Sequence, residues 1–259
     1  MGQSFIRTVL VCTLTAASAS VFAAPPGLLM TYSFDSLSGK FGQPQEIKAR
    51  SFTLGATLLG EGYRASVFVP YISLEGPGTL VAGTVANAGS ASTRRSEQGM
   101  GDIVGTYTKD IIGSIQSKGF AMSATGLVKI ASGNEKRGLG TGKTDYGIQA
   151  DLAYRFNNGF GLTAIVGRQY YGDTPELPLL NGHYSTVGVN FPLGDSLFIN
   201  LNTSQRDELL AGTEKRKERA ISAVYALDTT SALQFGYTKG RSTASPDDVV
   251  SISYVSQVE

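Results

Sequence analysis

Residues Thr144 to Phe156, TDYGIQADLAYRF, alternate between apolar and polar side chains at almost every step. One side carries Tyr146, Ile148, Ala150, Leu152, Tyr154 and Phe156, and the other carries Asp145, Gly147, Gln149, Asp151, Ala153 and Arg155. Successive side chains of a strand point to opposite faces, so this pattern predicts a strand between an apolar and a polar medium. Tyr and Phe stand at the ends of the apolar side, as in a strand that faces lipid and ends at the membrane interface.

The same alternation recurs along the chain, in residues 51–58, 64–71, 120–130, 197–204, 220–227, 233–238 and 250–255. We count roughly twelve such strands, each close to the ~10 residues that a tilted strand needs to cross the hydrocarbon. The connections alternate in length. Short ones are expected at 60–62, 157–159, 192–195 and 228–230, and long polar ones at 38–47, 74–99, 132–143, 172–182, 206–217 and 241–247.

Short turns on one rim and long loops on the other are typical of an outer-membrane barrel with periplasmic turns. The predicted fold is therefore all-β: a single up-and-down antiparallel transmembrane β-barrel of about twelve strands, with both termini periplasmic.

The first residues read as an export signal. Met1 to Arg7 carries one positive charge, a largely apolar stretch follows, and Val21-Phe22-Ala23 is a small-residue cleavage site. We predict a signal peptide at 1–23 and the barrel at 24–259. The mature chain has no apolar run of the roughly 18 residues that a membrane helix requires, so the bacterial outer membrane is the expected location.

Composition narrows the possible functions. The formal net charge is +1 in 259 residues, so no basic excess suggests nucleic acid as a partner. The only cysteine, Cys12, lies in the signal peptide, which leaves neither disulfide nor thiolate metal chemistry to the mature chain. We expect no metal, no cofactor and no enzymatic activity.

The polar side of the strands supplies candidate residues for the lumen and the substrate path: Arg64, Lys129, Gln149, Asp151 and Arg155. Two interpretations remain open. The lumen could be filled by Arg–carboxylate pairs, which would make the protein a plugged structural or surface-interaction barrel. Alternatively, it could be a narrow polar passage whose diameter and charge select small solutes.

Two local patterns suggest enzymatic chemistry. Gly138 to Thr144, GLGTGKT, resembles a phosphate-binding loop, but Arg137 stands where that motif needs its first glycine, so an exposed hairpin connection is the better interpretation. His183 and Ser185 would share one strand face, as in an outer-membrane lipid hydrolase, with Asp173 or Glu176 as the acidic partner. The favoured interpretation of His183 is an interfacial position beside Tyr184.

The segment from Arg206 to Arg219, RDELLAGTEKRKER, is dense in charge. Its basic residues could bind lipopolysaccharide phosphates from a surface loop, or could simply be a solvated loop tip: Lys215, Arg216, Lys217 and Arg219. The loop at 75–99, with Arg94 and Arg95, is expected to fold over the mouth or to be mobile.

Three motifs resemble one protein family. They are VPYISLEGPG (69–78), GMGDIVGTYT (99–108) and GLVKIASGNEKRGLGTGKTDYGIQADLAYRF (126–156). They are similar to outer-membrane barrels grouped as transporters of the MetA-pathway of phenol degradation. The resemblance covers nearly the whole mature chain. It implies an outer-membrane barrel that passes small molecules, including hydrophobic or aromatic compounds, and brings no catalytic residues.

One departure concerns assembly. Such barrels usually end in an aromatic residue that the outer-membrane assembly machinery reads, whereas this chain ends Ser256-Gln257-Val258-Glu259, with Tyr254 as the nearest aromatic residue.

The sequence predicts an outer-membrane channel or uptake protein for small molecules. Its expected partners are outer-membrane lipids, lipopolysaccharide, a small-molecule solute and the assembly machinery. The alternatives are the plugged barrel and the lipid hydrolase.

Overall fold

The computed structural model describes residues 26–81, 84–86, 96–114, 117–172, 175 and 177–258. The predicted signal peptide at 1–23 lies outside these residues. So do Arg94, Arg95, Asp173 and Glu176, to which the sequence analysis gave possible roles, and the terminal Glu259.

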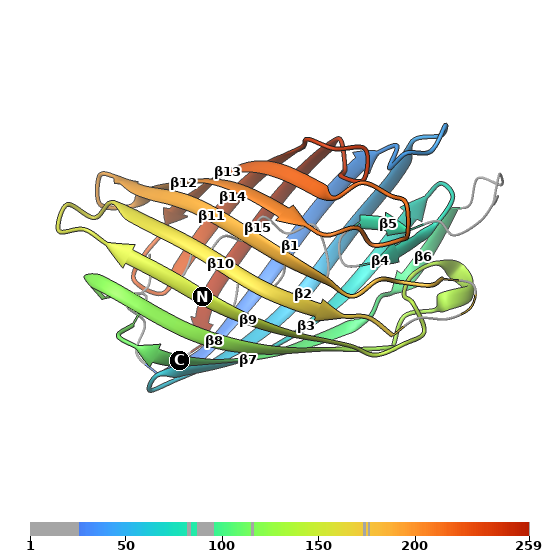
Figure 1. Ribbon diagram of the computed structural model, residues 1–259. Coiled ribbons are helices and arrows are strands. Elements are labelled where there is room, and N and C mark those ends of the chain that lie inside the picture. The colour runs from blue at the N-terminus through green and yellow to red at the C-terminus, as the bar shows by residue number, and fades with distance from the viewer. Residues whose placement is uncertain are drawn as a thin grey trace.

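Twelve antiparallel strands form a closed barrel, because the first strand pairs with both the second and the last (Figure 1). Thr31, for example, lies opposite Val255 on one side and Gly55 on the other. The strands are β1 (Gly27–Gly39), β2 (Ile47–Gly60), β3 (Tyr63–Glu75), β7 (Ile103–Ile112), β8 (Gly119–Ile130), β9 (Asp145–Arg155), β10 (Gly161–Tyr170), β11 (Gly182–Leu193), β12 (Leu197–Arg206), β13 (Arg216–Ala226), β14 (Ser231–Gly240) and β15 (Asp248–Val258).

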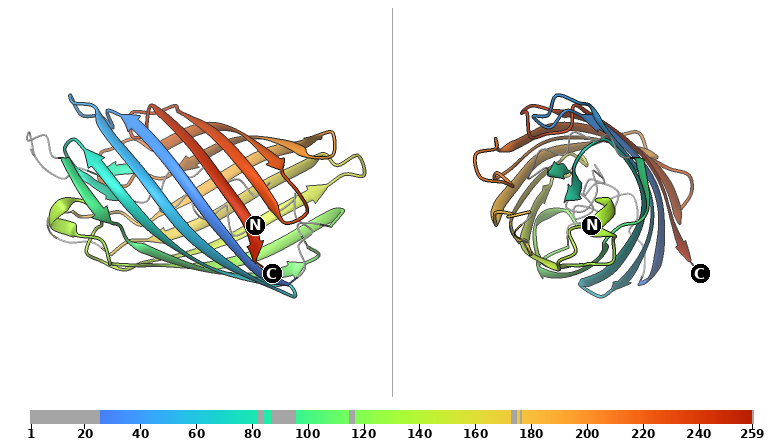
Figure 2. Two further views of the ribbon diagram at one scale, coloured as in Figure 1. Left: turned by 180° about the vertical axis from the view of Figure 1, so that it is seen from behind. Right: turned by 90° about the vertical axis from the view of Figure 1, so that its right-hand side faces the viewer.

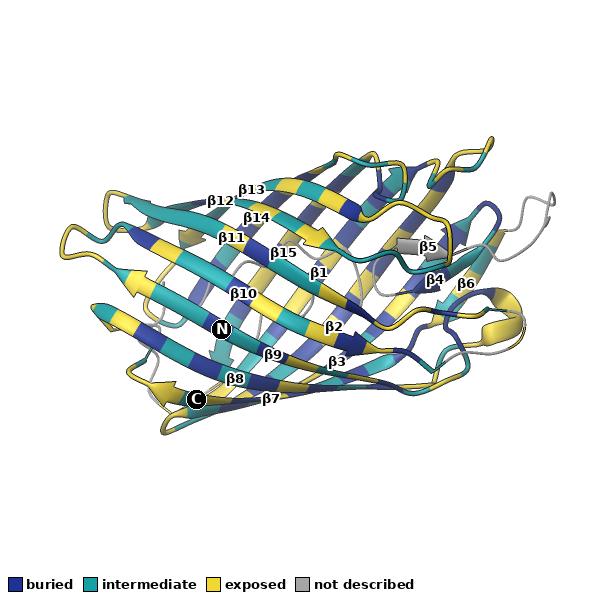
Figure 3. Cartoon of the chain, in the orientation of Figure 1, coloured by how far each residue is buried: buried dark blue, intermediate teal, exposed yellow. Residues whose placement is uncertain are grey.

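The two faces of the wall follow the predicted alternation, and buried and exposed residues alternate along the strands in Figure 3. In β9, Ile148 is 60% exposed whereas Asp151 is 6% exposed. The outer face carries Leu, Ile, Val, Phe and Tyr side chains on every side of the barrel. A closed sheet satisfies its own backbone hydrogen bonds, and with an apolar exterior it suits hydrocarbon surroundings. The predicted fold class is confirmed.

The connections also divide as predicted. Those between β2 and β3, β7 and β8, β9 and β10, β11 and β12, and β13 and β14 are short and lie at one end, together with the C-terminal end of β15. We call this the turn end. The opposite end, the loop end, carries the connections 40–46, 76–102, 131–144, 171–181, 207–215 and 241–247. Among the described residues, no helix has the length and apolar character needed to cross a bilayer.

The loop end folds into the barrel. The connection after β3 contains the short strands β4 (Thr79–Val81), β5 (Thr84–Ala86) and β6 (Ser96–Met100), and the connection after β8 contains a 3-10 turn, η2 (Glu135–Arg137). The right-hand view of Figure 2 shows β4, β5 and η2 within the ring of strands. β6 pairs with the end of β3 and continues into β7 through Gly101 and Asp102.

These loops build an apolar core inside the barrel at its loop end. Leu80 and Leu139, from the two connections, pack against inward-facing side chains of the wall: Leu37, Ile47, Ala49, Ile72, Leu74 and Val249. A second apolar cluster joins Val81, Tyr171 and Leu179 to Leu177, Leu209 and Leu210. Inward-facing positions near the loop end are therefore apolar and covered by the protein's own loops, a feature that neither interpretation of the lumen included.

Candidate functional site

The five predicted lumen residues lie on inward-facing positions of β3, β8 and β9. Arg64, Lys129, Gln149 and Asp151 are buried, and Arg155 is half-buried at the turn end of β9. They do not form one group. Arg64, Gln149 and Asp151 belong to a polar zone of the wall, whereas Lys129 lies close to the infolded loops.

Arg64 forms a buried ion pair on the inner wall. Its Nη1 lies 3.2 Å from Oδ1 of Asp110, which comes from β7, the strand paired with β3. Nε and Nη2 of Arg64 have no hydrogen-bond partner among the described residues. Because a guanidinium carries five N–H donors, the single ion pair with Asp110 leaves buried donors of Arg64 without an acceptor among the described residues.

A chain of hydrogen bonds runs beside this ion pair. The Tyr184 hydroxyl donates to Oε1 of Gln149 (2.9 Å), and Nε2 of Gln149 donates to Asp151. Asp151 also accepts from Oγ1 of Thr125 (3.1 Å), which contacts Thr108 Oγ1 at 2.9 Å. The chain therefore spans β11, β9, β8 and β7 along the wall.

Gly167 makes the first link possible. Tyr184 is on β11 and Gln149 on β9, and β10 lies between them with Gly167 opposite Tyr184. A Cβ at Gly167 would come within 2.3 Å of Cζ of Tyr184. The missing side chain leaves room for the ring to cross β10. On its other side, the Arg206 guanidinium lies 5.1 Å from the Tyr184 ring centroid, at cation–π distance.

Lys129 anchors the infolded connection 131–144. Its Nζ lies 2.9 Å from Oδ2 of Asp102, 3.0 Å from Oδ2 of Asp145 and 2.6 Å from Oγ1 of Thr141, and the two carboxylates are buried. Asp102 also accepts from the amide of Gly133 (2.9 Å), so it is bonded to both ends of the connection. A buried cation between two carboxylates and a hydroxyl fixes this loop to the wall.

The buried ion pairs run along the wall. Arg64 and Asp110 come from the neighbouring strands β3 and β7, and Lys129 meets Asp145 of the neighbouring β9. The expectation for a plugged barrel was paired charges that cross the interior. Among the described residues, the pairs do not take that form, and the infolded material at the loop end is apolar.

The predicted basic loop cluster is divided among different places. Only Lys215 lies in the connection 207–215, where it pairs with Asp207 at 2.9 Å. The other three residues belong to β13. Arg216 is buried and pairs with Glu218 at 2.6 Å, whereas Lys217 and Arg219 are exposed on the outer face. Strand alternation inside β13 separates residues that the sequence places together.

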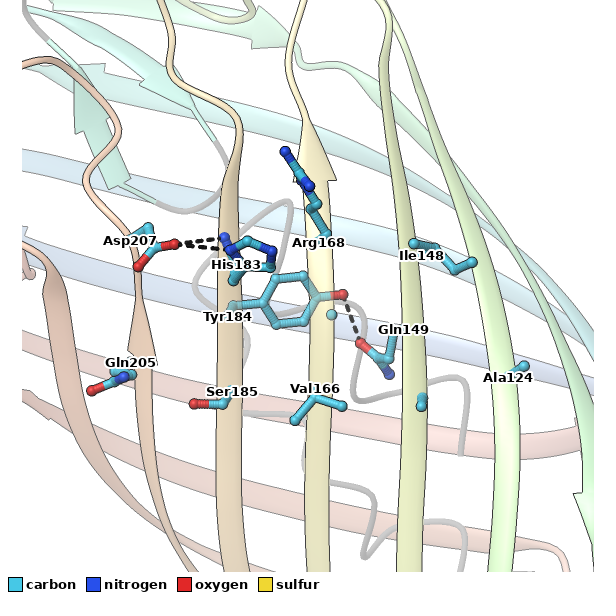
Figure 4. Close-up of a pocket in the computed structure, with 12 residues that line it drawn as sticks. Ala124, Ile148, Gln149, Val166, Arg168, His183, Tyr184, Ser185, Gln205 and Asp207 are labelled. Atoms are coloured by element: carbon cyan, nitrogen blue, oxygen red, sulfur yellow. Dashed lines mark hydrogen bonds and ion pairs between the residues drawn. The ribbon is translucent and has the colours of Figure 1, made fainter.

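His183 has an acidic partner that the sequence analysis did not name. Its Nδ1 lies 3.3 Å from Oδ2 of Asp207, and its backbone amide donates to the same oxygen at 2.9 Å. This amide, together with the Lys215 ammonium, holds the pKa of the Asp207 carboxyl below its ordinary value. Ser185 faces the same side of β11, but Figure 4 shows its hydroxyl directed away from the His183 ring. Among the described residues, no hydrogen bond joins the two side chains.

The GLGTGKT segment belongs to the connection between β8 and β9, as expected, and leads from η2 into β9. The expectation that it is exposed is wrong, because Gly138 to Thr141 are buried and Leu139 packs in the apolar core. A Cβ at Gly140 would meet the Asp102 carboxylate, so the glycine lets the loop pass close to this acid. A loop that lies against a buried carboxylate is a poor site for phosphate.

We predict that Lys129→Met destabilises the folded barrel by about 3–5 kcal/mol, because two buried carboxylates lose their cation. Urea unfolding in detergent micelles measures the loss, and faster tryptic cleavage after Lys136 or Lys143 reports the freed loop. Arg137→Met is the matched control, since its pair with Glu97 is partly exposed and contributes at most about 1 kcal/mol. Equal losses in the two variants would contradict the anchoring role.

We also predict that Gly167→Ala destabilises the barrel by about 1–3 kcal/mol, because the added methyl group displaces the Tyr184 ring. Gly126→Ala is the control, because nothing lies within 4 Å of a Cβ at that outward-facing position. Unfolding midpoints in urea compare the two variants. A Gly167→Ala protein as stable as Gly126→Ala would show that Tyr184 does not need this gap.

No family model and no curated protein matches the sequence. Solved structures do match the fold. A COG4313 outer membrane channel from Pseudomonas putida F1 superimposes with a TM-score of 0.72 at 11% identity, over 92% of this chain and 98% of that one. The NanC porin gives 0.56 at 12% identity, over 90% and 100% of the two chains. The β domain of the Bordetella autotransporter BrkA gives 0.50 at 11%, over 90% and 100%. A channel, a porin and an autotransporter domain share this barrel, so the likeness establishes the fold alone.

Proposed function

We propose that the protein is a channel of the bacterial outer membrane that passes small solutes and is not an enzyme. The observation that carries this proposal is the inner wall, whose buried charges pair with neighbouring strands rather than across the barrel. Such a wall keeps charged and hydrogen-bonding groups beside the axis, where they can act on a solute. The similarity to a COG4313 outer membrane channel supports the same function.

The proposed orientation places the turn end in the periplasm and the loop end outside the cell, as in other outer-membrane barrels. We retain residues 1–23 as the export signal and 24–259 as the mature barrel. β15 pairs with β1 as far as Val258, and the ring of Tyr254 stacks on Tyr32 at 6.3 Å.

The proposed solutes are hydrophobic or aromatic compounds. A solute that enters from the loop end meets the apolar clusters around Leu80 and Leu179 before it reaches the polar zone around Asp151. This order favours molecules that partition into apolar surfaces. The three sequence motifs similar to transporters of the MetA-pathway of phenol degradation support the same class of solute.

The polar zone would set charge selectivity. We assign this role to Arg64, Asp151, Gln149 and Arg155, since they lie on inward-facing positions of β3 and β9, and to Asp110 through its pair with Arg64. Lys129 would act on the path indirectly, by holding the connection 131–144 in the mouth.

Planar-bilayer recording of the refolded protein tests the proposal. We expect discrete conductance steps, a lower cation preference in Asp151→Ala and a higher one in Arg155→Ala, because each change removes one lumen charge. Ser253→Ala, an inward-facing change without charge on β15, is the control. Uptake of a monoaromatic hydrocarbon and of a sugar into proteoliposomes separates hydrophobic from hydrophilic solutes. Absence of both conductance and uptake would refute the channel and favour the plugged barrel.

A second candidate function is lipid hydrolysis, which the contact between His183 and Asp207 favours. The hydrolase would use Ser185 as nucleophile and His183 as base, with Asp207 orienting the imidazole ring. It predicts fatty acid release from phospholipid or lipid A in detergent micelles, and loss of that release in His183→Ala. No release from the folded wild-type protein would exclude it.

A further inference from the structure

A groove of about 560 Å³ lies in the outer wall of the barrel, over β8 to β12 (Figure 4). One cross-strand row of outward-facing residues runs through it: Ala124 lies opposite Ala150, Ala150 opposite Val166, Val166 opposite Ser185 and Ser185 opposite Gln205. These side chains point away from the lumen, because the inward-facing positions of the same strands are odd-numbered in β8, β9 and β10 and even-numbered in β11 and β12. The groove therefore opens towards lipid.

Apolar groups line most of the groove. Ile148 and Val166 are 60% and 52% exposed on the outer wall, and the short side chains of Ala124 and Ala150 leave space beside them. The shape and the lining suit a hydrocarbon chain lying along the wall.

The side of the groove nearest the loop end is polar and charged. It is formed by Arg168 on β10, His183 on β11 and Asp207, the first residue after β12. The Asp207 carboxylate is already bonded to the amide and ring of His183 and to Lys215. Among the residues that the structure describes, no carboxylate lies within ion-pair distance of Arg168, whose guanidinium sits 5.1 Å from the Tyr170 ring centroid.

Two more outward-facing cations lie on β13 beside the groove. Lys217 lies opposite Gln205 of the groove, and Arg219 lies opposite Thr203. Both are exposed on the outer face, and within the described part of the chain neither has a carboxylate at ion-pair distance. An apolar groove bordered by unpaired cations matches a molecule with an acyl chain and a negatively charged headgroup.

We propose that this outer-wall groove binds lipid A of lipopolysaccharide, with one acyl chain along Ala124, Ala150 and Val166 and a phosphate on Arg168. The choice of lipid A rests on the orientation under the proposed function, which places the loop end in the outer leaflet. Gln149, Gly167 and Tyr184 of the inner-wall chain also border the groove. The proposed contacts are all with outward-facing residues, so lipid A binding does not depend on the solute that the channel passes.

Native mass spectrometry of the detergent-solubilised barrel, titrated with diphosphoryl lipid A, tests the proposal. We expect Arg168→Gln to weaken binding about tenfold, the effect of losing one charge-assisted contact, and Arg168→Lys to restore part of it. Ala150→Leu, which fills the groove without changing charge, should weaken binding to a similar extent.

Two matched variants serve as controls. Ala164→Leu makes the same change on the outer face of β10 outside the groove, and Arg50→Gln removes an exposed outward-facing cation on β2. Both should bind lipid A within about twofold of the wild type, since about 0.4 kcal/mol corresponds to that factor. All variants are checked for folding by the heat-dependent mobility of barrels in gels. A binding result for Arg168→Gln or Ala150→Leu is used only if that variant is folded.

Wild-type affinity in Arg168→Gln and Ala150→Leu would overturn the proposal. So would binding of phosphatidylglycerol as tight as that of diphosphoryl lipid A, because the groove would then be a general lipid site.

Conductance of Arg168→Gln should equal that of the wild type, since Arg168 faces lipid. A failure of lipid A binding with intact conductance would thus refute this site alone, and a failure of conductance with intact binding would refute only the channel.

Discussion

The need to satisfy every backbone N–H and C=O group without water governs this structure. In hydrocarbon a sheet can do so only by closing on itself, and here closure comes from the pairing of β1 with β15 as well as β2. Closure gives the wall an inside and an outside, and the two-residue period of a strand then assigns each side chain to one of them. The outward residues become apolar, as Ile148 is, and the inward ones become polar, as Asp151 is. The candidate lumen and the outer-wall groove are consequences of the same constraint on opposite faces.

The inner wall also buries charged side chains, which is costly in free energy unless they are paired. Arg64 and Lys129 are surrounded by protein, yet each meets carboxylates from adjacent strands or from a loop that folds against them. Pairing with neighbouring strands lowers the free-energy cost of burying each ion, and these pairs do not cross the axis of the barrel. The loop end is packed with apolar side chains instead, since Leu80 and Leu139 form an apolar core with inward-facing wall residues. The mouth is therefore apolar and the zone below it is polar, an order that underlies the proposed preference for hydrophobic solutes.

Much of the fold could be predicted from local pattern. Alternation around Asp145 to Phe156 and in the other strands identified the barrel, and the sorted lengths of the connections identified its two ends. The candidate lumen residues lie on the inward face for the same reason. Their partners were not predicted, because Asp102, just before β7, and Asp110, on β7, are distant in sequence from Lys129 and Arg64 and approach them only when the strands pair. Asp110 does follow the inward alternation of β7 from Val104 onwards, a signal that could have identified it. Gly167 offered no local signal at all, since its importance depends on a Tyr184 ring that crosses from the next strand.

The sequence by itself determined which residues face lipid and which face the interior, because strand period is a local property that each segment carries alone. It also determined the alternation of turns and loops. Only the tertiary structure decided which charges meet, which loops enter the mouth, and that His183 lies beside Asp207. It also divided the basic run at 215–219 between loop, lumen and outer wall. These outcomes depend on the register and closure of twelve strands, and no single segment encodes them.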